Sequence, residues 1–177
     1  MNNNDVEAII QIIVILVLLG MFLFPFLLFF IYVFYQNSKR KRIRERARNA
    51  YAHMIGNGKA IPVRYASEPR FKLWFKIFPW EGTGLLVPAP GCITFVGEKL
   101  NGVPLNLQFV PGQSNISWLG KCPWPNGAVS WFAFDVQGLK HYFTSETGPF
   151  VFGSHGSTKS AYEESYNSLA LTSGHST

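Results

Sequence analysis

The sequence predicts an α+β, mainly β protein: an N-terminal transmembrane helix, then a small antiparallel β-barrel or sandwich with a C-terminal helix. Three observations predict this fold. Residues 8–35 are apolar except for Gln11, residues 39–48 are strongly basic, and the rest alternates aromatic or β-branched runs with glycines and prolines. The chain therefore divides into a tail with a membrane helix (1–36), a basic juxtamembrane helix or linker (37–58), a β domain with its closing helix (59–171) and a loose tail (172–177).

The apolar run exceeds the roughly 20 residues that a helix needs to cross the hydrocarbon core of a bilayer. It should be helical because a backbone in lipid must satisfy its own hydrogen bonds, and Pro25 should bend it. A secretory signal peptide is the main alternative. It would need a positively charged N-terminal region and a small-residue cleavage site. The first seven residues here instead contain two acids, Asp5 and Glu7, and aromatic residues stand at the end of the apolar run. We expect an uncleaved span.

The basic stretch after the run predicts the orientation of the chain. Seven Lys or Arg residues lie between Lys39 and Arg48 against one acid, Glu45, and no Lys or Arg precedes residue 8. Basic residues beside a membrane helix stay on the cytoplasmic side. We therefore expect a single-pass protein of the cell (inner) membrane, with the N-terminus outside and the β domain in the cytoplasm.

The same stretch has helical spacing and should continue the helix to about Met54, where Gly56-Asn57-Gly58 stops it. Its charges can attract anionic headgroups by about 1 kcal/mol per basic residue, or they can serve only to set the topology. Nucleic acid is not an expected partner, because the stretch accounts for the whole net charge of +6. The candidate lipid-contacting residues are Lys39, Arg40, Lys41, Arg42, Arg44, Arg46 and Arg48, with Lys72 and Lys76 further along.

The β domain should begin with a strand over residues 71–78. Its apolar residues alternate, with Lys72, Trp74 and Lys76 on the second face; a surface helix in the headgroup region is the alternative. A hairpin turn is expected at Gln137-Gly138, where glycine can adopt a positive φ. A helix should follow from Ser157 or Thr158 to Leu169. The further expected strands are 84–87, 91–96, 104–109, 114–119, 128–136 and 139–145.

This order of strands and helix, over residues 71–171, resembles the pleckstrin-homology-like superfold and its GRAM-type members. The segments that carry the resemblance are Gly91-Cys92-Ile93-Thr94-Phe95, residues 138–145 and the closing helix. The resemblance implies a platform that binds lipid headgroups or proteins, not an enzyme. Phosphoinositide binders of that superfold carry a basic cluster in the first loop between strands. The corresponding turn here, residues 78–84, has no Lys or Arg, which argues against specific phosphoinositide binding.

No residue pattern predicts catalysis, a cofactor or a metal site. Cys92 and Cys122 lack the spacing of a metal or redox motif, and the four histidines have no partner at ligand spacing. In a cytoplasmic domain both cysteines should be reduced; an inverted topology would allow a disulfide between them. An enzyme with an unrecognised site remains an alternative, and it would need a deep pocket lined by Cys122, His141 or Asp135.

The tryptophans are the candidate anchors for a protein partner. Exposed aromatic side chains are typical of interaction hot spots, and we expect Trp74, Trp80 and Trp124 to serve in this way. Trp118 and Trp131 are assigned to the core. The leading hypothesis is a non-enzymatic accessory or assembly subunit of a larger membrane complex, whose cytoplasmic domain docks a membrane protein. The alternative is a membrane-anchored module that senses anionic lipid headgroups.

Overall fold

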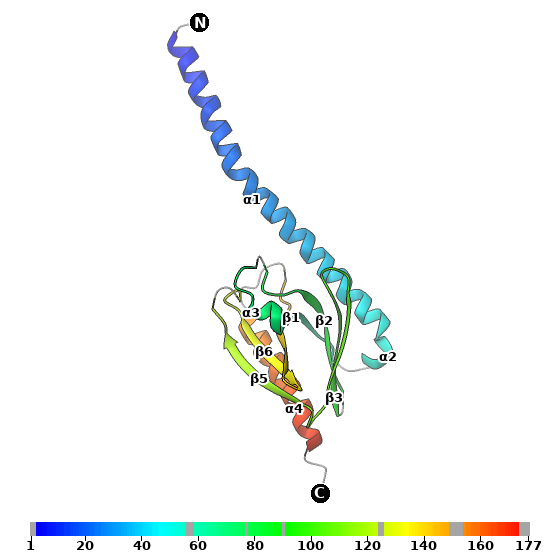
Figure 1. Ribbon diagram of the computed structural model, residues 1–177. Helices are drawn as coiled ribbons and strands as arrows, with labels where there is room; N and C mark the ends of the chain where they lie inside the picture. The colour runs from blue at the N-terminus through cyan, green and yellow to red at the C-terminus, as the bar shows by residue number, and fades with distance from the viewer. Residues whose placement is uncertain are drawn as a thin grey trace. The chain divides into compact units, whose positions relative to one another are not determined.

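The computed structural model describes residues 3–55, 59–76, 78–89, 91–123, 126–148 and 154–173 (Figure 1). The chain divides into two units, Met1–Asn37 and Ser38–Thr177. The first helix, α1 (Asn3–Ala50), contributes to both, and a short helix, α2 (Ala52–Ile55), follows it. The expected helical continuation of the apolar run through the basic stretch is therefore confirmed as far as Ala50, with a turn at Tyr51 before α2; the expected stop at residues 56–58 lies outside the described residues.

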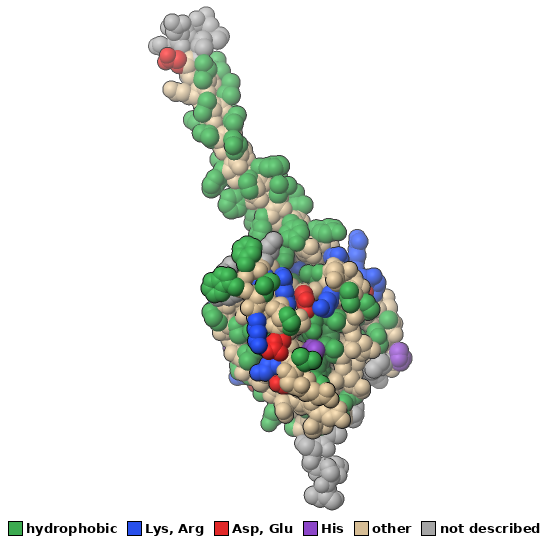
Figure 2. All heavy atoms as spheres, viewed as in Figure 1, with side chains coloured by type: hydrophobic (Ala, Val, Ile, Leu, Met, Phe, Trp, Pro, Cys, Tyr) green, Lys and Arg blue, Asp and Glu red, His purple; other side chains and the backbone are tan. Residues whose placement is uncertain are grey.

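The first unit is the apolar part of α1. The helix passes through Pro25, and it contains an 18-residue window of mean hydropathy 3.1 within Ile9–Ala50. Figure 2 shows apolar side chains along its length, and the large apolar residues between Ile9 and Tyr35 with described side chains are mostly exposed. Among the described residues this is the one helix that is long and apolar enough to cross a membrane.

The second unit is built on one curled antiparallel sheet of seven strands, a half-barrel. The strand order is β4-β3-β2-β1-β7-β6-β5, so β4 and β5 form the two edges. The expected hairpin is confirmed, with Gln137 and Gly138 both at positive φ between β6 and β7. The strands are β1 (Ile61–Ser67), β2 (Gly82–Ala89), β3 (Cys92–Lys99), β4 (Pro104–Phe109), β5 (Ser114–Lys121), β6 (Ser130–Val136) and β7 (Leu139–Ser145).

The concave face of the sheet is closed by α4 (Ser154–Ser173), the expected C-terminal helix, which starts before the expected Ser157 or Thr158 and continues past Leu169. Alternate residues of the strands point inward, so Phe132 and Phe143 pack with Ala161 and Leu169 of α4 in the main core. Thr158 anchors the first half of the helix, because its hydroxyl oxygen accepts a hydrogen bond from the backbone N–H of Ser145 at 3.1 Å.

The convex face is covered as well, by the basic end of α1 and by a second cluster that includes Trp80. The basic end of α1 packs Ala47 against Leu85, Val87 and Val96 of β2 and β3. A second cluster on this face contains Trp131, which is fully buried as expected, and it includes Trp80 and Tyr142. With both faces covered, even the outward-facing residues of the central strands are buried.

The strand expected over residues 71–78 is wrong. Residues Glu68–Lys72 form a short helix, α3, with Pro69 in its first turn, and no strand is assigned among the described residues 73–76 and 78. The ammonium of Lys76 instead turns back and donates hydrogen bonds to the carbonyl oxygens of Arg70 and Phe71, at 3.0 and 2.7 Å. The first strand along the chain is instead β1, a segment that was not among the expected strands.

Candidate functional site

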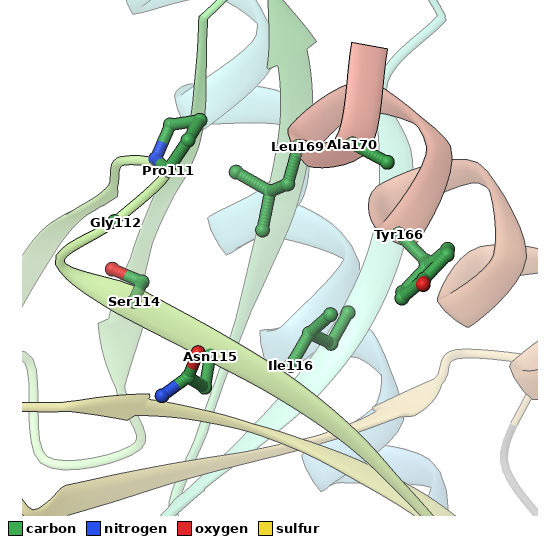
Figure 3. A pocket seen from close by; sticks show the side chains of 8 residues that line it. All are labelled: Pro111, Gly112, Ser114, Asn115, Ile116, Tyr166, Leu169 and Ala170. Carbon is green, nitrogen blue, oxygen red and sulfur yellow. The ribbon is translucent and has the colours of Figure 1, made fainter. Parts of the chain in front are cut away.

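A groove of about 250 Å³ opens between the start of β5 and the second half of α4 (Figure 3). Ile116 of β5 faces Tyr166 and Leu169 of α4 across it. Tyr166 is half exposed, whereas Leu169 reaches back into the main core. The groove therefore offers an apolar floor with an accessible aromatic rim. Its lining consists of Pro111, Gly112, Ser114, Asn115, Ile116, Tyr166, Leu169 and Ala170.

The turn that forms one wall of the groove is set by its own sequence. Gly112 has a φ of 80°, a conformation that side chains with a Cβ rarely adopt. The Ser114 hydroxyl oxygen then accepts a hydrogen bond from the backbone N–H of Val110 at 3.2 Å, while the Ser114 N–H donates to the Val110 carbonyl at 2.9 Å. These bonds fix the direction in which β5 starts.

β5 brings an unpaired edge beside this groove. It pairs with β6 along one side and lies at the end of the seven-stranded order, so no described strand covers its other side. An open edge presents backbone donors and acceptors to any extended segment that approaches it. The groove and the edge thus form one continuous candidate site for a peptide.

The basic end of α1 is tied to the β domain by a buried carboxylate. Glu146 follows β7, and its two side-chain oxygens bind Arg64 at 2.6 Å, Arg44 at 3.0 Å and Arg40 at 3.1 Å. Arg64 and Arg40 are 0 and 1% exposed. The ring of Trp80 lies 4.1 Å from the Arg64 guanidinium carbon and 5.5 Å from that of Arg40, so it stabilises both cations.

Burial of Glu146 on its own would raise the pKa of its carboxyl group, because a charge is poorly solvated inside a protein. The hydrogen bond and charge of Arg64, with the charges of Arg40 and Arg44, outweigh that effect and hold the pKa below its ordinary value. Glu146 is therefore an anion in the folded protein at neutral pH, and it partly neutralises three cations.

The nine candidate lipid-contacting residues differ in their exposure and in their partners. Arg40, Arg44 and Lys76 point inward; Lys76 is 7% exposed and also binds the side-chain oxygen of Asn126 at 2.5 Å. Arg46 is exposed but pairs with Glu98 at 3.0 Å, and Lys72 is exposed and pairs with Glu68. The others are Lys39, which is half-buried, and the exposed Lys41, Arg42 and Arg48.

A second cavity, of about 240 Å³, lies where α1 crosses β1 and β2. Lys41, Arg44 and Arg48 supply three positive charges to its wall, and Glu45 supplies one negative charge. Pro62 and Leu85 form the apolar remainder of the lining. Its net charge suits an anionic group.

The three candidate partner-binding tryptophans are not equivalent. Trp74 is 79% exposed, whereas Trp80 is 3% exposed and stacks on Phe78. Trp80 is therefore part of the interior and not a surface anchor, and its ring contacts the buried guanidinium groups of Arg40 and Arg64. Trp124 lies outside the described residues.

The residues considered for catalysis do not converge on either of these cavities. Cys92 and Cys122 are free, half-buried thiols, and burial raises the pKa of Cys122. His141 lies 3.1 Å from the Tyr65 hydroxyl; burial lowers the pKa of His141 and raises that of Tyr65 to about 12. Neither cavity is lined by Cys122, His141 or Asp135. Within the described ranges, no three His, Cys, Asp or Glu residues are grouped so as to hold a metal ion.

Comparisons with protein families, with curated proteins and with solved structures find no match to this chain.

Proposed function

We propose that the protein is a non-enzymatic, single-pass membrane protein whose cytoplasmic, pleckstrin-homology-like domain docks a partner protein, as an accessory or assembly subunit of a larger membrane complex. The long apolar part of α1 supports the membrane anchor. The seven-stranded antiparallel order with a helix closing the concave face supports the domain type. Domains of this kind act as binding platforms.

The observation that carries the docking role is the groove beside the open edge of β5. An extended segment of a partner can add a strand to such an edge, because its backbone supplies the missing hydrogen bonds. Its alternate side chains would then enter the groove between Ile116 and Leu169. The expected ligand is thus an extended, partly apolar stretch of another protein.

The tie between α1 and the β domain supports a role at the membrane. The domain unit starts at Ser38, three residues after the last apolar residue of the run, Tyr35. Three arginines of the domain unit converge on Glu146, so the helix end and the sheet move together. A partner bound to this domain would be held next to the bilayer.

Site-specific photocrosslinking in native membranes tests the docking role. A photoreactive amino acid replaces Tyr166 at the rim of the groove, and a matched control replaces Leu139, which is 64% exposed in the β6–β7 hairpin. We expect discrete adducts with another protein from position 166 and none from position 139. Absence of adducts from position 166, or the same adducts from both positions, contradicts docking at the groove.

The cavity between α1 and the first strands favours a second candidate function, binding of an anionic headgroup. Here the test is the thermal stability of the full chain in nanodiscs with and without anionic lipid. Anionic lipid should raise the unfolding temperature of the native chain, and the double variant Lys41→Gln/Arg48→Gln should lose that increase. A control variant, Lys121→Gln/Lys159→Gln, removes two exposed charges outside the cavity. An equal lipid effect in all three proteins would eliminate this function.

A further inference from the structure

Three consecutive apolar residues project from the β domain between α3 and β2. Leu73, Trp74 and Phe75 are 47, 79 and 83% exposed. We call this segment the apolar tip. Isolated apolar residues are common on protein surfaces, but adjacent exposed aromatic residues at the end of a loop are typical of an interaction site.

The apolar tip is held out by a rigid support. Lys76 donates to the carbonyl oxygens of Arg70 and Phe71 at the end of α3, which closes the loop at its base. Its third acceptor is Asn126, in the connection between β5 and β6, so the loop is also fixed to the sheet. On the other side of the tip, the ring of Phe71 stacks on Tyr142 at 3.9 Å between centroids. The residues on both sides of the tip are thus held against the domain, while the tip itself is exposed.

A chain of contacts places the apolar tip at the end of the domain where the unit begins. The Arg70 guanidinium donates to the Phe78 carbonyl at 2.8 Å, and Phe78 stacks on Trp80. Trp80 lies beneath Arg40, the third residue of the domain unit. The base of the tip and the start of the domain unit therefore share one cluster.

The short connection between the apolar helix and Arg40 brings the start of the domain unit close to the lipid headgroups. Arg40 follows the last apolar residue of α1, Tyr35, by five residues, which is about 7.5 Å of helix rise. The polar layer on each side of the hydrocarbon core is itself about 5–7 Å thick. Tryptophan and other aromatic side chains are favoured in that layer.

We infer that the apolar tip, Leu73-Trp74-Phe75, inserts into the bilayer interface as a second membrane contact. This inference rests on the proposed membrane anchor. The occupant is lipid rather than protein, because the proposed anchor brings lipid close to Arg40 through the covalent connection, whereas a protein contact would require a further partner.

Depth-dependent fluorescence quenching tests this with the full chain in phosphatidylcholine nanodiscs, with and without bromine on the acyl chains. Three variants each add one tryptophan: Phe75→Trp in the tip, Phe30→Trp in the apolar helix and Tyr166→Trp on α4. Tyr166 is a matched exposed control in the second half of α4, which lies away from α3 in Figure 1. Its neighbour Glu164 pairs at 2.9 Å with Lys59, a residue that follows α1 and α2 in the sequence. The emission that each variant adds to the native signal is compared.

We expect the brominated lipid to lower the added tryptophan emission several-fold at positions 75 and 30. The added emission at position 166 should not change. Quenching at position 30 but not at position 75 overturns the inference and leaves the anchor intact. A blue-shifted but unquenched signal at position 75 indicates contact with protein, including a second copy, and also overturns it. Loss of quenching at position 30 removes the anchor itself.

Discussion

Glu146 is the single acid on which three arginines of the domain converge. Replacing it with glutamine keeps the size of the side chain but leaves Arg64 and Arg40 buried without a counter-charge. Removing one partner of a buried ion pair typically costs about 3–5 kcal/mol. We expect Glu146→Gln to lower the free energy of unfolding by about that amount, measured by denaturant unfolding of the full chain in detergent.

The matched control is Glu98→Gln. Glu98 also pairs with an arginine of α1, Arg46, but that side chain is 64% exposed. An exposed pair contributes only about 0–1 kcal/mol. If the two variants lose the same stability, the buried cluster does not hold the domain to the helix end.

The lowered pKa of Glu146 predicts an acid dependence of stability. The carboxyl ordinarily has a pKa of 4.5, and its value in the folded protein is lower. As the pH falls, the unfolded chain therefore takes up this proton first, so Glu146 stabilises the fold above about pH 4.5 and this contribution is lost as the pH falls through the folded pKa. Unfolding free energies measured from neutral to acid pH should show that loss, and the Glu146→Gln variant should lack this part of the dependence.

The burial of charged residues and of their aromatic partner, Trp80, is also what the sequence did not reveal at the scale of single residues. Arg64 lies in the middle of β1, where Ile61, Val63 and Tyr65 do alternate toward the core, but a proline at position 62 and an arginine at position 64 argue against a buried central strand. Trp80 looked like a surface anchor because its buried partners, Arg64 and Arg40, come from distant parts of the chain. Cation–π contacts of this kind have no sequence spacing that would reveal them.

At the scale of elements, the basic end of α1 has two roles: it places positive charge next to the apolar helix, and it packs on the sheet. The sequence shows only the first. Ala47 is 7% exposed and contacts Leu85, Val87 and Val96. The segment is therefore a structural part of the β domain as well as a charged border of the apolar helix.

Substitution of Ala47 by aspartate tests this packing. A buried, unpaired carboxylate is strongly unfavourable, so the helix end should leave the sheet. We expect trypsin to cleave after Lys41 and Arg42 several-fold faster in Ala47→Asp than in the native chain, as followed by mass spectrometry. The control is Ala50→Asp, because Ala50 is exposed near the end of the same helix. Equal cleavage rates in both variants would show that α1 is not held there.

Most strands were predictable because turn residues separate them. Gly138 takes a positive φ in the β6–β7 hairpin, as its place in the sequence indicated. The segment 71–78 misled because its alternating apolar residues do not share one environment: Phe71 packs against Tyr142, whereas Leu73 and Phe75 are 47 and 83% exposed. Alternation in the sequence therefore does not by itself establish a strand, because four consecutive residues here, 72–75, are exposed.

For the whole molecule, the sequence predicted the coarse architecture: an apolar helix, a curled antiparallel sheet and a closing helix. It did not predict the groove, whose walls come from residues 111–116 and 166–170. These segments are about 50 residues apart, and only the curl of the sheet and the docking of α4 bring them together. A site formed by tertiary packing leaves no local motif.

The orientation of the chain is the prediction on which the compartment of both candidate sites depends. Seven basic residues follow the apolar run and none precedes it, so the β domain should stay in the cytoplasm. Burial of Arg40 and Arg44 against Glu146 leaves Lys41, Arg42 and Arg48 exposed to retain this bias. We expect an epitope tag placed after Thr177 to resist protease added to intact cells and to be lost after permeabilisation, whereas a tag before Asn2 should be removed from intact cells. Digestion of the C-terminal tag in intact cells would place the domain outside, where Cys92 and Cys122 would meet oxidising conditions and a cytoplasmic partner could not reach the groove.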